Sequence, residues 1–158
     1  MALSQAQIKG RIKNIAKTNK SDARILMRIY MMERFLERMA KSKYSENFII
    51  KGGILITSLV GVSLRSTMDI DTSIRGFTLS QEEAMRIVKE ISEINLEDDV
   101  TFRVKSVSGI MDEMDYPGIR FLISHNSWFL IIKREKTMIS SRFLSVFSYF
   151  VAPQPEQV

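Results

Sequence analysis

Two aspartates stand two positions apart in an otherwise apolar run, Met68-Asp69-Ile70-Asp71-Thr72. In a β-strand, residues i and i+2 point to the same face, so both carboxylates lean toward one point. Two anions held together repel each other and therefore need cations between them. Carboxylate oxygens suit Mg²⁺ or Mn²⁺, ions that proteins often share with substrate phosphates. The pair therefore predicts a metal and nucleoside triphosphate (NTP) site, with the chemistry of nucleotidyl transfer.

A pair of glycines upstream, Gly52 and Gly53, supplies the second half of this predicted site. Glycines after a strand let a phosphate approach the backbone amides closely, and the N-terminus of a following helix favours negative charge. Lys51, Arg65 and Thr67 can add charged and hydroxyl donors for the triphosphate. Taken singly, each feature has a structural alternative: the glycines as a plain turn, the aspartates as caps, Lys51 as a strand end in water.

The elements that must position these residues follow from local patterns. Residues 47–51 read as a buried strand, 52–53 as a turn, 54–60 as a short helix, and 68–74 as a second strand. Two helices precede them, capped by Ser4 and Ser21, and a third follows Ser80. Strands are predicted from Val100 and over 118–124.

These elements predict an α/β (α+β) fold, in which a mixed sheet is packed against N-terminal helices. After Ser124 the apolar runs show no clean period. We therefore predict a core over residues 1–124 and a diverged or truncated segment over 125–158, with a disordered tail.

Composition excludes several classes of protein. The chain has 158 residues, no cysteine and one histidine, so disulfides, thiolate metal sites and multi-histidine sites are excluded. No apolar run is long enough to span a bilayer, and no signal peptide is visible at the N-terminus. We expect a soluble cytoplasmic protein without a membrane partner.

Charge is unevenly distributed along the chain. Residues 1–46 carry 11 Lys or Arg and 4 Asp or Glu. Residues 47–115 carry 7 Lys or Arg and 12 Asp or Glu. The basic N-terminal segment could face a polyanion such as RNA, or could simply be a solvated helical surface. The acids Glu97, Asp98 and Asp99 are expected to form a solvated turn.

The segment "FIIKGGILITSLVGVSLRSTMDID" resembles the core of AbiEii-type abortive-infection toxins, a branch of the nucleotidyltransferase superfamily. The later "YPGIRFLI" fits as well, and the resemblance covers roughly residues 23–123. The matching motif residues are Lys51, Gly52, Gly53, Arg65, Thr67, Asp69, Ile70 and Asp71. The resemblance implies a toxin of a bacterial type IV toxin–antitoxin or phage-defence system. Such a toxin would bind Mg²⁺–NTP, act on RNA as a possible acceptor, and have a cognate antitoxin.

The chain departs from that family after residue 124. Family members place a third carboxylate on the strand that follows the "YPGIRF" strand. Here the only acids after Asp115 are Glu135, in a cationic turn-like setting, and Glu156, in the tail. Two hypotheses follow: a nucleotidyltransferase-like enzyme using Asp69 and Asp71, or a truncated relic that binds nucleotide, RNA or a partner without catalysis. A carboxylate beside the pair in the fold would distinguish them.

Overall fold

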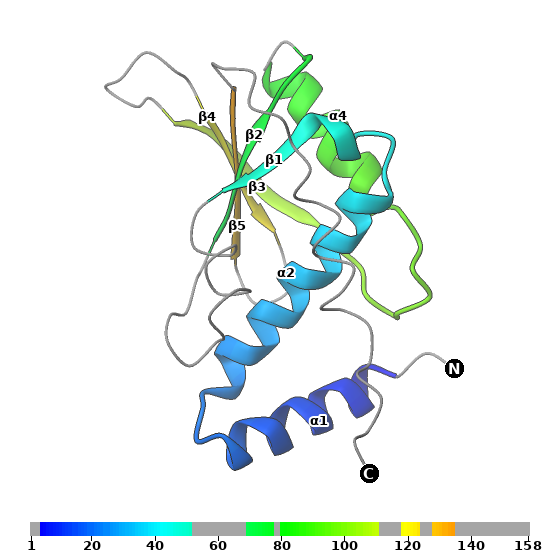
Figure 1. Cartoon of the computed structure of the whole chain (residues 1–158), viewed down its shortest axis with the longest axis vertical. Coiled ribbons are helices and arrows are strands. Elements are labelled where there is room, and N and C mark those ends of the chain that lie inside the picture. The colour runs from blue at the N-terminus through cyan, green and yellow to red at the C-terminus, as the bar shows by residue number, and fades with distance from the viewer. Residues whose placement is uncertain (1–3, 52–68, 78–79, 111–117, 124–127, 135–158) are drawn as a thin grey trace.

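The structure is a computed structural model that describes residues 4–51, 69–77, 80–110, 118–123 and 128–134. Within these ranges the chain forms three α-helices and a five-stranded mixed sheet, which confirms the predicted α+β class (Figure 1). The helices are α1 (Gln5–Thr18), α2 (Ala23–Lys41) and α4 (Gln81–Ser92), and a short 3₁₀ helix spans Ser45–Asn47. The strands are β1 (Phe48–Lys51), β2 (Asp69–Ile74), β3 (Val104–Ile110), β4 (Gly118–Ile123) and β5 (Trp128–Arg134).

The helix starts follow local capping chemistry. Ser4 and Gln7 form a capping box at the start of α1, and the Ser80 side chain accepts a hydrogen bond from the Glu83 amide in α4. Both caps confirm the sequence prediction. The cap of α2 is Asp22, whose carboxylate accepts from the Arg24 amide, and not the predicted Ser21. Either residue type can fill this position, so the sequence left the helix start uncertain by one residue.

The strand order is β1-β2-β5-β4-β3, and only the β2–β5 pair is parallel. β5 lies in the segment for which the sequence predicts no element, yet it occupies the middle of the sheet. We therefore propose that the core continues past residue 124 through β5. The predicted strand from Val100 is shorter than expected, because it begins at Val104.

One face of the sheet packs against α2 and α4 to form the core. Ile70 and Ile74 of β2, Phe121 of β4, and Leu130 and Ile132 of β5 are fully or almost fully buried in it. The helices contribute Met32, Phe35, Leu36, Met39, Ile87 and Ile91. Burial of this apolar surface supplies the main stabilisation of the fold. α1 lies outside this core and packs across the N-terminal half of α2 (Figure 1).

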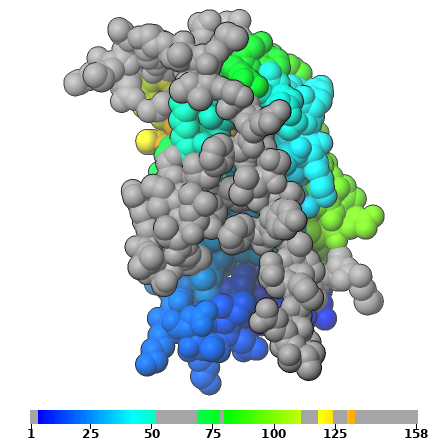
Figure 2. Space-filling model, viewed as in Figure 1, coloured from blue at the N-terminus to red at the C-terminus, as the bar shows by residue number. Residues whose placement is uncertain are grey.

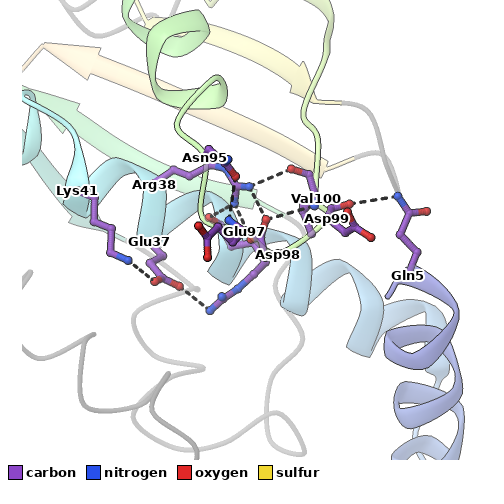
Figure 3. Close-up of polar contacts among 10 residues, drawn as sticks. Gln5, Glu37, Arg38, Lys41, Asn95, Glu97, Asp98, Asp99 and Val100 are labelled. Carbon is purple, nitrogen blue, oxygen red and sulfur yellow. Dashed lines mark hydrogen bonds and ion pairs between the residues drawn. The ribbon is translucent and has the colours of Figure 1, made fainter. Parts of the chain in front are cut away.

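A buried ion pair ties α2 to the loop between α4 and β3. The Arg38 guanidinium donates to both carboxylate oxygens of Asp98, at 2.9 and 2.6 Å, and also to the Val100 carbonyl (Figure 3). The side chains of Arg38 and Asp98 are only 2% and 11% exposed. Burial alone would raise the pKa of Asp98, but the hydrogen bonds and charge of Arg38 hold that pKa below its usual value. The predicted solvated turn is therefore wrong at Asp98, and Arg38 is a core residue.

We predict that Asp98→Asn lowers the free energy of unfolding by about 3 kcal/mol, because it leaves the buried Arg38 charge without its counterion. Urea unfolding followed by circular dichroism measures the change. The matched control is Glu93→Gln, which removes a carboxylate from an exposed pair with Lys89 and should cost no more than about 0.5 kcal/mol.

Acid titration provides a second measurement of the same interaction. The folded pKa of Asp98 lies below its unfolded value, so the pair stabilises the fold above the unfolded pKa and loses this effect as pH falls through the folded pKa. The difference between parent and Asp98→Asn should therefore narrow in acid. A constant difference from neutral to strongly acidic pH would contradict this account.

Candidate functional site

The predicted carboxylate pair lies on β2, in the interior of the sheet between β1 and β5. Asp69 and Asp71 are partly exposed, whereas Ile70 between them is fully buried in the core. This alternation places both carboxylates on the sheet face opposite α2 and α4. β2 therefore presents the two aspartates as the sequence predicts, with the intervening residue holding the strand to the core.

Register across the sheet identifies the neighbours of the pair. Lys51, the last residue of β1, stands opposite Asp71. On the other side, β5 places Phe129 beside Asp69 and Ile131 beside Asp71. Because paired residues in neighbouring strands point to the same face, Lys51 and Ile131 flank Asp71 on the face of the carboxylates.

The cross-strand row that contains Asp71 extends to an arginine on β4. Arg120 of β4 pairs with Ile131, so one cross-strand row runs from Lys51 through Asp71 and Ile131 to Arg120. Arg120 is exposed and its charge acts on Asp69. The charge of Arg28, from the first half of α2, acts on Asp69 as well. Sequence reasoning missed both arginines; the only available signal was the position of Arg120 inside the "YPGIRF" motif.

The pKa of Asp69 is raised from its usual value. Burial is the main cause that raises the pKa of Asp69, and the neighbouring charge of Asp71 raises it further. Arg120 and Arg28 act in the opposite direction without cancelling the rise. The two carboxylates are thus held close enough for repulsion, which is the condition under which a divalent cation binds favourably.

The remaining predicted site residues lie outside the described residues. These are Gly52, Gly53, Arg65 and Thr67. Lys51 is described, pairs with Asp71 in the sheet register, and directly precedes Gly52 in the sequence. The contact between the glycine turn and the carboxylates stays a prediction.

No third carboxylate accompanies the pair in the described part of the chain. On β5, the described side chain that faces the same way as Asp71 is the apolar Ile131. Across the described ranges, no group of three or more His, Cys, Asp or Glu side chains could hold a metal ion. Two carboxylates can suffice for one divalent cation when water and substrate oxygens complete its coordination.

Comparison with known proteins identifies the family of this domain. The profile described as "AbiEii: Nucleotidyl transferase AbiEii toxin, Type IV TA system" matches residues 34–136. This match spans the whole sheet from β1 to β5. No curated protein matches the chain by sequence. The described helices include none that is long and apolar enough to cross a bilayer.

We predict that Asp69→Asn stabilises the metal-free protein, since it removes a partly buried charge that Asp71 repels. The midpoint of urea unfolding in the presence of EDTA should rise relative to the parent. Glu93→Gln again serves as control, because it removes the exposed charge of the residue that caps the C-terminus of α4 and is paired with Lys89. A midpoint that falls for Asp69→Asn would show that Asp69 contributes a net stabilising contact.

Proposed function

Because the chain belongs to the AbiEii nucleotidyl transferase toxin family of type IV toxin–antitoxin systems, we propose that it binds a metal–NTP complex at Asp69 and Asp71 and transfers a nucleotide to RNA. The observation that carries this proposal is the carboxylate pair itself. It lies on one face of an interior strand, where burial and the neighbouring charge of Asp71 raise the pKa of Asp69. A cognate antitoxin is the partner that this family implies.

Each described residue then has a role set by its position. Asp69 and Asp71 bind one Mg²⁺ or Mn²⁺, which the triphosphate oxygens share. Lys51 at the end of β1 and Arg120 on β4 flank the pair on the same face. Both can donate to phosphate oxygens, with Arg120 able to do so through two parallel N–H groups. Gly52, Gly53, Arg65 and Thr67 would complete the triphosphate site.

In this proposal, Ile131, the β5 neighbour of Asp71, limits the rate of nucleotide transfer. Two-metal catalysis uses one ion to activate the attacking hydroxyl and another to stabilise the leaving pyrophosphate. Ile131 occupies the neighbouring position at which a carboxylate could help hold the second ion. We therefore propose that binding of the metal–NTP complex is efficient and transfer is slow. The alternative function, a relic that binds nucleotide without catalysis, differs from this proposal only in showing no transfer at all.

We predict that Asp69→Asn combined with Asp71→Asn abolishes binding of Mn²⁺–NTP, because the metal loses both charged ligands. Isothermal titration calorimetry with each NTP, with and without Mn²⁺, measures the change. The control is Glu82→Gln combined with Glu93→Gln, which removes the same charge from exposed positions of α4. Equal binding by parent and the aspartate double variant would refute the assignment.

We also predict that Ile131→Asp accelerates transfer of labelled nucleotide to RNA by at least tenfold, since it places a third carboxylate beside Asp71. Incorporation into bulk RNA in the presence of Mn²⁺ is the measurement. Ile131→Asn is the matched control: it introduces the same polar shape into a position that is 8% exposed, without the charge. Each variant is first checked for folding by circular dichroism.

Fast transfer by the parent, abolished by Asp71→Ala, would contradict the rate limit. It would mean that another carboxylate of this chain, or of a partner, serves as the third ligand. Acceleration by Ile131→Asn equal to that by Ile131→Asp would show that space, and not charge, limits the reaction.

A further inference from the structure

α1 carries a surface of uncompensated positive charge. Its buried face consists of Ile8, Ile12 and Ala16, which pack against α2. All basic residues in and directly after this helix are exposed: Lys9, Arg11, Lys13, Lys17 and Lys20. No Asp or Glu precedes Asp22 in the sequence. In the space-filling view, the blue atoms of α1 and the start of α2 form one protruding end of the molecule (Figure 2).

The cations of α1 form no ion pair with another described element of the fold. Within the described residues, the ion pairs of the chain involve α2, α4 and their flanking residues, and none includes a basic residue of α1. Lys9, Lys13 and Lys17 follow one another at intervals of four, so they form a single ridge with about 6 Å of helix axis between neighbours. Like charges at this spacing destabilise an isolated helix. Folding therefore gives no reason for the ridge, whereas an anionic partner does.

The lysine ridge is connected to the carboxylate pair through α2, the helix that follows α1 in the chain. The pKa of Asp22, at the start of α2, is lowered mainly by its hydrogen bonds from Arg24, and the charge of Arg28 acts weakly on Asp22 and also on Asp69 at the start of β2. Arg28 thus lies within electrostatic reach of both. Since α1 ends at Thr18 and α2 begins at Ala23, only four residues separate the cationic helix from the helix that carries Arg28. A flexible polyanion lying along α1 could continue past Arg28 to the site.

The chemistry of α1 favours a nucleic-acid backbone over a membrane surface. Helices that lie in a membrane interface expose an apolar face with large side chains such as Trp, Phe or Leu. Here the apolar face is covered by α2, and Ile15 is the only large hydrophobic residue of the described chain that is strongly exposed. Lysines act as point charges toward phosphate and read no base sequence.

We propose that the lysine ridge of α1, Lys9, Lys13 and Lys17, is a docking surface for the phosphate backbone of single-stranded RNA. The identity of the polyanion as RNA rests on the proposed transfer to RNA, whereas the ridge itself rests on the charges of α1. Single-stranded RNA suits this geometry because it can bend from α1 toward β2, which a stiff DNA duplex does not do over such a distance. The ridge binds acceptor strands without regard to sequence, and the carboxylate pair acts on the end that reaches it.

The test is fluorescence anisotropy with a labelled 20-nucleotide single-stranded RNA, using the full chain at 0.1 M salt. The variant is Lys9→Gln, Lys13→Gln and Lys17→Gln combined. Each lost phosphate contact on a single strand is worth about fivefold at this salt concentration, so the triple variant should bind roughly a hundredfold more weakly. The slope of log K against log salt should become less steep by about two.

The matched control removes three exposed positive charges elsewhere, with Lys89→Gln, Arg103→Gln and Lys105→Gln. It should lose less than about fivefold in affinity. Thermal unfolding verifies that both triple variants are folded. Equal losses in the two triple variants, or a loss below about threefold in the α1 variant, would overturn the proposal. Duplex DNA that binds the parent as tightly as the RNA does would overturn the choice of RNA.

Failure of the docking surface on α1 is distinguishable from failure of the proposed nucleotide site. Asp69→Asn combined with Asp71→Asn should retain RNA binding, and the α1 variant should retain Mn²⁺–NTP binding. Loss of RNA binding in the aspartate double variant would contradict a docking surface on α1. Absence of Mn²⁺–NTP binding by the parent, with RNA binding sensitive to the lysine ridge, would reject the nucleotide site and leave the ridge in place.

Discussion

The parallel ladder between β2 and β5 is the interaction on which the rest of the sheet depends. β1 and β2 form one antiparallel pair, and β3, β4 and β5 form an antiparallel three-stranded unit. Only the six residue pairs from Asp69–Phe129 to Ile74–Arg134 join these two parts. The same ladder places both aspartates directly beside β5, which separates them from Arg120 on β4. The sheet and the candidate site therefore both depend on the position of β5 between β2 and β4.

The charges around the carboxylate pair come from separate elements that this ladder and α2 bring together. Lys51 is contributed by β1, Arg120 by β4 and Arg28 by α2. Burial and the charge of Asp71 raise the pKa of Asp69, and the charges of Arg120 and Arg28 oppose this rise without cancelling it. A site that is only partly neutralised keeps affinity for a further cation. It also keeps positive charge nearby for the phosphates that such a cation would carry.

The sequence predicted those parts of the fold that have local causes. The helices α1 and α4 follow from capping residues and apolar spacing, and β2 follows from the alternation around Ile70. β5 could not be read this way because Leu130, Ile131 and Ile132 are all buried, so the strand shows a continuous apolar run instead of an alternation. The burial of Asp98 could not be predicted either, since its partner Arg38 lies 60 residues earlier in the chain. Of the site, the carboxylate pair was predictable from spacing alone, whereas Arg28 and Arg120 reach it only through tertiary structure.

Ile131 connects the packing of the sheet to the chemistry of the site. It is 8% exposed although it lies on the face of the carboxylates, so this position serves packing on a surface where the neighbouring strand presents charge. With an apolar residue there, the pair has fewer charged ligands to hold a metal ion by itself. The triphosphate must then supply a larger share of the coordination, because Mg²⁺ is commonly bound through one or two carboxylates together with substrate phosphates. Metal and nucleotide would consequently bind as a unit, each raising the affinity for the other by the same factor. If the proposed site binds metal and NTP, Ile131 would in this way couple metal binding to the presence of substrate.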